Sequence, residues 1–421
     1  MRKTLPIIAF LLSVALQVCA QQKNYDFQEG KLFYKITDAT KQYVQVTTEL
    51  DELLEATGTL YNSPIKGDVA IPANVNYQGK QYTVTGIGDN AFGGCTQVTS
   101  VSMPASITSL GEQVFLSCTG LKRITVDSNN TVLKDVDGVL FDKSGNKLIA
   151  YPNMRATNYD IPEGTVELGA ASFFMCNEIK NINFPPTLKK IGMLAFGICS
   201  KMNEVTIPET VTELGDFAFY NCTGLEKAII KANISELKRY MFSRCTALKE
   251  VSLPSTIEFI RTWAFGSCAA MKNIKLPDNL KGIEAEAFNG CETLSEITLP
   301  ASLEQIGMYT FDGCKQLKCI TCLRDTPLKG AAMGAGVFEN VDKIACELKV
   351  PKGHRNEYAE AEQWGDFTRI SEHDLSGIST IISQDSNTQT TIFTINGQRL
   401  PNNTQPSHGI YIINGKKVCV K

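Results

Sequence analysis

A cysteine recurs along this chain at a fixed interval, and this periodicity constrains the fold more than any other feature. Cys95 and Cys118 are 23 residues apart, and from Cys176 to Cys314 a cysteine returns every 23 residues. Each of these cysteines follows a phenylalanine by three positions, so the motif Phe-x-x-Cys occurs in nine copies. A repeat of this length predicts a solenoid in which each unit forms one coil and rests against its neighbours.

One clean unit, residues 248–270, shows how a coil is built. Leu248, Val251 and Leu253 follow the spacing L-x-x-L-x-L and predict a short strand with these side chains facing inward. The remainder predicts a turn with a helical or 3₁₀ segment, on which Phe265 and Cys268 also point inward. One unit cannot bury this apolar face alone, so stacking must create a continuous core. We therefore expect an α/β-type right-handed leucine-rich-repeat solenoid with one parallel β-sheet face.

The repeat is interrupted in three places. Extra residues around Gly79 predict a hairpin, and residues 138–151 predict two short strands around a turn at 142–146. The last predicted strand ends at Pro351, and Tyr358, Trp364 and Phe367 follow on an expected terminal helix that caps the core.

These features divide the chain into six segments. We predict a signal peptide at 1–20, an N-terminal cap and first coil at 21–81, the solenoid at 82–323 with an insert at 127–161, a C-terminal capping segment at 324–372, a linker at 373–388 and a small β module at 389–421. Two Asn-Gly pairs, at 396–397 and 414–415, predict hairpins in this last module.

The N-terminus has the features of an export signal. Arg2 and Lys3 precede an apolar run over residues 5–16, and the sequence Val-Cys-Ala at 18–20 predicts cleavage after Ala20. A lipoprotein signal with lipid on Cys19 is the alternative. No later apolar segment is long enough to predict a transmembrane helix.

Composition argues against several classes of function. The net charge of −3 leaves no large field that would attract nucleic acid. All histidines lie near the C-terminus, at positions 354, 373 and 408, so the repeats lack the residue most used for acid–base and metal chemistry. No Ser-His-Asp set or Gly-rich phosphate loop is recognisable. We therefore predict no catalytic residue, cofactor or metal, and expect the protein not to be an enzyme.

The cysteines themselves allow more than one interpretation. Neighbouring coils could form a stack of disulfides or a metal site, but side chains in register point the same way, which favours buried, reduced thiols. Cys319 and Cys322 could form a redox or zinc pair. Their strand register instead predicts that Cys322 faces the core and Cys319 faces outward.

The repeat resembles the BspA-type leucine-rich-repeat surface proteins of Gram-negative bacteria. The Phe-x-x-Cys copies with Ile/Leu-Pro strand ends carry this resemblance, together with the insert Val-Asp-Gly-Val-Leu-Phe at 136–141 and the segment from Val350 to Phe367. The tail from Ile395 to Val418 is similar to a type A C-terminal sorting domain. The resemblance implies a secreted or surface-held protein, and some members are described as adhesins for host matrix proteins.

A candidate binding site lies in a column of residues two positions before each repeat phenylalanine. Consecutive coils place Phe217, Tyr240 and Trp263 in this column, with Tyr309 two coils further on and Ile229 on the outward strand face. Such aromatic side chains could stack on sugars or receive a peptide. The alternative is that the rings only pack on one another and on arginine stems nearby.

We therefore expect a non-enzymatic binding or adhesion module at the cell surface. Its partner would be a host matrix or surface protein, or a glycan, and not nucleic acid. The alternatives are a secreted hydrolase of a surface polymer and a purely structural component of the surface.

Overall fold

The computed structural model describes residues 23–49 and 63–373, together with three strands of the C-terminal tail. The chain forms two compact units that divide after His373. The predicted signal peptide, the alternative lipid site at Cys19 and residues 374–388 of the predicted linker lie outside the described residues.

The N-terminal part forms a small sheet, and the first coil contributes strand β4 (Lys66–Ala70) to a separate sheet. The strands of the small sheet are β1 (Phe27–Glu29), β2 (Leu32–Asp38), β3 (Tyr43–Thr47), β5 (Asn74–Tyr77) and β6 (Lys80–Ile87), in the order β1-β2-β3-β6-β5. The predicted hairpin is present, because Tyr77 pairs with Lys80 across a two-residue turn. Gln78 and Gly79 have φ angles of 49° and 73°, as a type I′ turn requires. Strand β6 also pairs with β8 (Ser109–Leu110), which joins this sheet to the coils.

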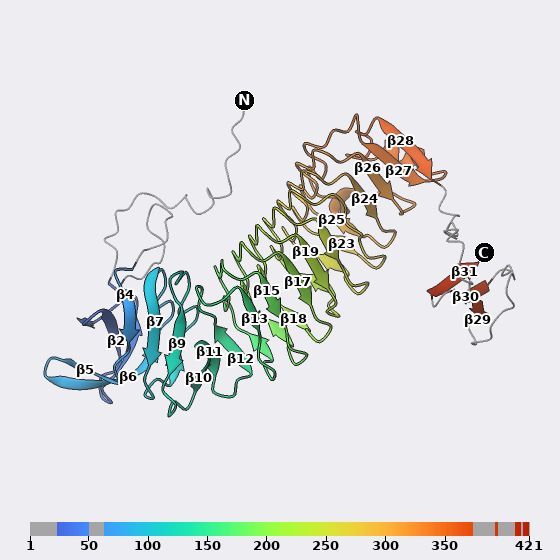
Figure 1. The fold of residues 1–421 in the computed structure, drawn as a ribbon. Helices are drawn as coiled ribbons and strands as arrows, with labels where there is room; N and C mark the ends of the chain where they lie inside the picture. The colour runs from blue at the N-terminus through green and yellow to red at the C-terminus, as the bar shows by residue number, and fades with distance from the viewer. Residues whose placement is uncertain (1–22, 50–62, 374–391, 395–408, 414–415, 421) are drawn as a thin grey trace. The chain divides into compact units, whose positions relative to one another are not determined.

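The coils stack side by side and form the predicted parallel solenoid (Figure 1). Their longer strands form the front sheet, in which residues 23 positions apart pair, such as Lys227 with Glu250. The front sheet is divided into four segments. Its strands are β4 (Lys66–Ala70), β7 (Gln97–Met103) and β9 (Arg123–Val126); β13 (Asn158–Asp160) and β15 (Asn181–Asn183); β17 (Glu204–Ile207), β19 (Lys227–Ile230) and β21 (Glu250–Ser252); and β24 (Glu296–Leu299), β26 (Cys319–Cys322), β27 (Glu347–Pro351) and β28 (Arg369–His373).

A second ladder of short parallel strands, the rear ladder, replaces the helical return segment that we expected. It contains β14 (Glu167–Leu168), β16 (Lys190–Ile191), β18 (Glu213–Leu214), β20 (Glu236–Leu237), β22 (Phe259–Ile260), β23 (Gly282–Ile283) and β25 (Gln305–Ile306). The rest of each coil is turn. The reason is a pair of left-handed residues around each repeat phenylalanine, such as Tyr240 with φ 55° and Arg244 with φ 62°. A helix cannot continue through such residues.

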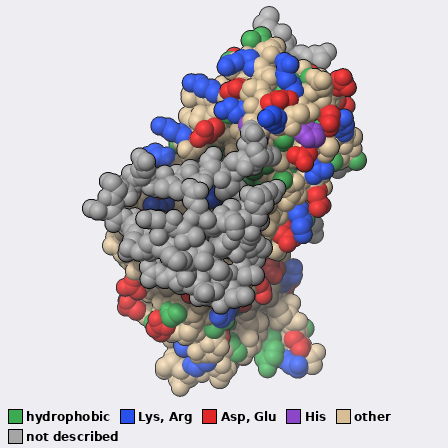
Figure 2. All heavy atoms as spheres, turned by 90° about the vertical axis from the view of Figure 1, so that its right-hand side faces the viewer, with side chains coloured by type: hydrophobic (Ala, Val, Ile, Leu, Met, Phe, Trp, Pro, Cys, Tyr) green, Lys and Arg blue, Asp and Glu red, His purple; other side chains and the backbone are tan. Residues whose placement is uncertain are grey.

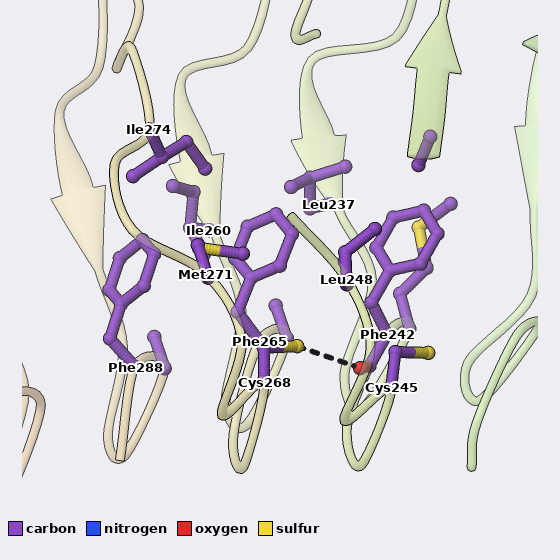
Figure 3. Packing of buried hydrophobic residues seen from close by; sticks show 14 of the residues in the cluster. Leu237, Phe242, Cys245, Leu248, Ile260, Phe265, Cys268, Met271, Ile274 and Phe288 are labelled. Atoms are coloured by element: carbon purple, nitrogen blue, oxygen red, sulfur yellow. Dashed lines mark hydrogen bonds between the residues drawn. The ribbon is translucent and has the colours of Figure 1, made fainter. Parts of the chain in front are cut away.

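The phenylalanines of the repeat form a continuous stack inside the coils (Figure 3). Successive rings lie 4.8 to 5.9 Å apart between centroids and are nearly parallel. Tyr151 of the insert begins this stack against Phe173, at 4.9 Å. The members are Phe173, Phe196, Phe219, Phe242, Phe265, Phe288, Phe311 and Phe338.

The repeat cysteine has a specific partner in the preceding coil. The Cys268 thiol donates a hydrogen bond to the backbone carbonyl of Phe242, with 3.2 Å between sulfur and oxygen (Figure 3). The equivalent bond from Cys245 reaches the carbonyl of Phe219 at 3.2 Å. Each cysteine therefore fills the core and also binds a carbonyl that faces it, which explains why the position repeats so strictly.

The insert divides the core that we expected to be continuous. Its strands β10 (Leu133–Val136), β11 (Val139–Asp142) and β12 (Lys147–Ala150) pair antiparallel, and the last two flank the predicted turn. Leu140 packs in the N-terminal hydrophobic cluster, whereas Val139 and Phe141 pack in the C-terminal cluster. Because alternate residues of a strand face opposite sides, β11 contributes to both cores and separates them.

The end of the solenoid differs from our expectation in two respects. Helix α1 (Arg355–Ala359) has only five residues and carries Tyr358, whereas Trp364 and Phe367 follow it in a turn. Gln363 adopts a left-handed φ of 65°, which a continuing helix does not allow. Trp364 and Phe367 nevertheless pack edge-on against Phe338, the last ring of the stack, and β28 adds a strand that we did not predict.

One regular coil also lacks its expected strand. Residues 271–277 carry the buried side chains of Ile274 and Leu276 but form no strand. Lys249 donates a backbone hydrogen bond to Glu226 one coil earlier, and Ser295 donates to Lys272 one coil later. No such bond joins Lys272 to Lys249 among the described residues.

In the second unit, β30 (Gly409–Ile413) and β31 (Lys416–Val420) form the predicted second hairpin of the tail, with Ile413 opposite Lys416. Strand β29 (Ile392–Thr394) pairs with β30, and the predicted turn at 396–397 lies outside the described residues.

Candidate binding surface

The predicted aromatic column lies in the turn that follows each strand of the rear ladder. Phe217, Tyr240 and Trp263 have φ angles of 60°, 55° and 56° there. Their neighbours Ala218 and Ala264 are fully buried, while the three aromatic side chains are half-buried. The left-handed backbone therefore turns these rings out of the core and holds them at the surface. We call Phe217, Tyr240 and Trp263 the aromatic ridge.

The rings of the aromatic ridge stack directly on one another. The centroids of Phe217 and Tyr240 are 4.5 Å apart, those of Tyr240 and Trp263 are 6.1 Å apart, and both pairs are parallel within 4°. Tyr220 packs edge-on against Phe217. The facing sides of these rings are thus occupied, and the ridge offers ring edges to a partner. Stacking on a sugar needs a free face, so this geometry favours contact with protein side chains over glycan stacking.

The other two candidate residues are not part of this stack. Tyr309 occupies the same column position with φ 53° and 40% of its side chain exposed, but Glu286 lies between it and Trp263. Its ring covers Gly336, where an added Cβ would lie 2.6 Å from the ring. Ile229 lies on β19 of the front sheet, between the buried residues Ala228 and Ile230, and is half-buried.

Sequence reasoning missed two exposed methionines beside this column. Met193 and Met308 each immediately precede a column residue, and they are 43% and 50% exposed. The signal was available, because both occupy the same repeat position, three residues before a core phenylalanine. Flexible, polarisable methionine side chains adapt to varied apolar partners, so they extend the apolar surface along the coils.

Charged residues border the aromatic ridge on the rear ladder. Arg261 forms ion pairs with Glu236 and Glu284, and its guanidinium lies over the ring of Phe259 at 4.8 Å rather than on the ridge. Burial tends to raise the pKa of Glu284, but hydrogen bonds from Arg261 and Thr262 outweigh it and lower that pKa. This carboxylate is therefore held ionised and fixed in place.

Glu286 has the opposite electrostatic environment. Burial raises its pKa, and the nearby charge of Asp312 raises it further, although a hydrogen bond from Trp263 opposes both effects. The side chain forms no ion pair within the described residues, and Asn289 lies 3.4 Å away as a weak donor. An incompletely compensated carboxylate thus stands at the end of the aromatic stack.

The front sheet presents a different, polar surface. Lys227 pairs with Glu250 at 2.9 Å, and Asn181 donates to Asn158 at 2.8 Å. The hydrogen bond that Lys227 donates to Glu250 raises the pKa of Lys227, which keeps this amine charged. On the different face drawn in Figure 2, positive and negative side chains are likewise intermixed over the coloured part of the surface. These partners satisfy one another between coils, so the front sheet offers a solvated face with few unpaired groups.

The described cysteines do not form a reactive centre. All are free thiols, and all except Cys319 are buried. Burial raises the pKa of Cys291 to about 12 and places that of Cys268 well above its ordinary value. Cys322 faces the core while Cys319 is half-buried on the outward side, as the register predicted. Burial therefore favours the protonated thiol at Cys268 and Cys291, and these side chains act as packing groups.

Metal-holding clusters and membrane-spanning helices are both absent from the described residues. No group of three or more His, Cys, Asp or Glu side chains is arranged there to hold a metal ion. No described helix has the length and apolarity needed to cross a membrane.

Comparison with known proteins identifies the repeat. Residues 73–146, 147–272 and 264–355 match the family described as BspA type leucine-rich repeat region, in six copies. No curated protein matches. A leucine-rich-repeat protein of Eubacterium ventriosum has a similar structure, with 22% identity over 68% of this chain and 93% of that one and a TM-score of 0.52. A leucine-rich cell-surface protein of Faecalibacterium prausnitzii matches at 19% identity over 70% of this chain and 94% of its own, with a TM-score of 0.37. The chain belongs to the family of BspA-type leucine-rich-repeat proteins.

Proposed function

We propose that this chain is a non-enzymatic binding module, exported to the cell surface or secreted by a Gram-negative bacterium, and that the aromatic ridge contacts its partner. The observation that carries the proposal is the parallel stack of Phe217, Tyr240 and Trp263 on left-handed turns at the surface. Aromatic side chains dominate the energy of protein interfaces, and a repeat scaffold can hold them in a fixed line. The front sheet around β19, where Lys227 pairs with Glu250, has less to offer a partner.

The chemistry of the ridge favours a protein partner, such as a host matrix or surface protein. The ridge exposes ring edges, and Met193 and Met308 add exposed apolar side chains on other coils. The export part of the proposal rests on the basic start, apolar run and predicted cleavage after Ala20, with lipid on Cys19 as the alternative. The similarity of the tail to a sorting domain supports the same destination.

The test is a quantitative binding panel with the mature chain against matrix proteins and surface glycans. The double variant Tyr240→Ala with Trp263→Ala should weaken partner binding at least tenfold, while Lys227→Ala on the front sheet should leave it unchanged. Equal affinity of the folded double variant and the wild type would remove the ridge from the interface.

The alternative of a secreted hydrolase makes a different prediction. It requires turnover of a glycan or peptide substrate, and that turnover must disappear when a specific carboxylate pair is changed. Such a result would replace the binding-module proposal.

A further inference from the structure

A second surface feature lies where the insert breaks the repeat. The front sheet stops at β9 and resumes at β13, and no residue of β9 has its Cα within 8 Å of β13. The turn between β10 and β11 takes the place of the missing strand, because Gly138 accepts a hydrogen bond from Ile124 at 2.9 Å. The backbone of Met154 bonds to Leu121 at 2.8 Å on the same side of β9. The insert is thus fixed to the sheet edge through its backbone.

These fixed segments border an open hollow of about 510 Å³, which we call the notch. This size lies within the range of small-molecule sites. Met154, with 47% of its side chain exposed, contributes an apolar wall, and the remaining side chains are mostly charged. The lining residues are Lys122, Arg123, Asp137, Met154, Arg155 and Ala156.

The notch holds cations that form no ion pair among the described residues, as do several other cations of the coils. Elsewhere, a lysine commonly pairs with an acid exactly one repeat away, as Lys281 does with Glu258 at 2.8 Å. Lys122 and Arg123 have no ion-pair partner among the described residues. The insert breaks the repeat after β9, and the next strand of the front sheet places Asn158 at the position that corresponds to Arg123. The pKa of Asp68 is lowered mainly by the hydrogen bonds that Ser100 and Thr99 donate to its carboxylate. The charge of Lys122 makes a smaller contribution in the same direction.

One carboxylate already occupies the notch. Arg155 forms an ion pair with Asp137, whose side chain is 87% exposed at the tip of the hairpin turn. Water screens this ion pair on the side of the exposed Asp137, so the pair adds little stability. A ligand carboxylate can therefore take the place of Asp137 at small cost, and Asp137 marks where a negative group sits.

We propose that the notch binds the carboxylate of an acidic sugar unit in an anionic glycan, as a ligand site separate from the aromatic ridge. Arg123 and Arg155 supply planar guanidinium groups that can hold a carboxylate through two parallel hydrogen bonds. Met154 supplies an apolar contact for the carbon face of the sugar ring. An extended acidic peptide fits less well, because the β9 amides of Ile124 and Val126 are already bonded to Gly138 and Asp135 and cannot pair with a new strand.

The test measures binding of the mature chain to oligosaccharides of galacturonic, glucuronic and sialic acid, with their carboxyl-reduced counterparts as controls, by calorimetry. Acidic sugars should bind at least tenfold more tightly than the reduced forms, and Arg123→Gln or Arg155→Gln should remove this preference. Asp137→Asn should strengthen binding severalfold, because the competing charge disappears while an Asn-Gly turn is kept. Lys281→Gln, a paired lysine outside the notch, should change nothing.

Several results would overturn the proposal. It is wrong if the chain shows no preference for carboxylated over reduced sugars, or if Asp137→Asn weakens binding. Tighter binding of a poly-glutamate peptide through Arg123 would assign the notch to a peptide, and equal competition by inorganic phosphate would make it a general anion site. The double variant of Tyr240 and Trp263 should keep acidic-sugar binding, so this proposal and that of the ridge can fail independently.

Discussion

The coil that contains Tyr240 offers a direct comparison between a core residue and a ridge residue two positions apart. Phe242 is fully buried, and its ring lies 5.5 Å from Phe219 and 5.7 Å from Phe265 in the core stack. Replacing a buried phenylalanine by alanine costs about 3–5 kcal/mol, because apolar contact is lost and a cavity remains. Phe242→Ala should therefore lower the free energy of unfolding by about 4 kcal/mol.

Tyr240→Ala should cost much less. Its ring is half-buried and stacks on Phe217 and Trp263, and each such aromatic pair contributes about 0.5–1.5 kcal/mol. The expected loss is roughly 1–2 kcal/mol, which leaves a folded protein for binding studies.

Urea denaturation followed by circular dichroism measures both variants, with the shift of the midpoint giving the difference in stability. The reasoning would be refuted by equal losses for the two variants, because then the left-handed turn would not separate the core from the surface. A larger loss for Tyr240→Ala would have the same meaning.

Three further predictions concern charge, thiols and backbone strain. The folded state raises the pKa of Glu286 above its value in the unfolded chain, so ionisation of this carboxyl destabilises the fold as pH rises. Glu286→Gln should therefore raise the melting temperature at pH 7 but not at pH 3. The folded state lowers the pKa of Glu284, so Glu284→Gln should lower the melting temperature at pH 7. Site-resolved alkylation of the native protein should label Cys319 among the described cysteines and leave Cys245 unlabelled until urea is added; rapid native labelling of Cys245 would contradict its burial. Ser267→Gly should stabilise the fold by about 0.5–1 kcal/mol, because Ser267 has a φ of 61° that glycine adopts without strain, and a lower urea midpoint would count against this account.

The repeat made the solenoid predictable, because a strict 23-residue period leaves few ways to bury Phe265 and Cys268. The outward register was also predictable from alternation along the strands, as the pairing of Lys227 with Glu250 shows. The rear ladder was not predictable, because its strands are only two residues long and too short to show the alternation of apolar and polar residues that indicates a strand.

The candidate site was predictable in position but not in geometry. The column of Phe217, Tyr240 and Trp263 follows from the repeat, since residues at equal positions stack. Their left-handed backbone could not be read from aromatic residues, which rarely adopt it, and it decides that the rings expose edges rather than faces. The notch depends on how the insert folds back on β9, and local sequence patterns do not specify such a long-range contact.

Hydrogen exchange on the partner complex tests the central claim most directly. The mature chain would be compared free and bound to the tightest ligand from the binding panel. The account predicts slower exchange in the turns around Phe217, Tyr240 and Trp263, with little change in the front-sheet strands β17, β19 and β21. Protection confined to those strands, with unchanged exchange in the three turns, would contradict the proposal that the aromatic ridge is the binding surface.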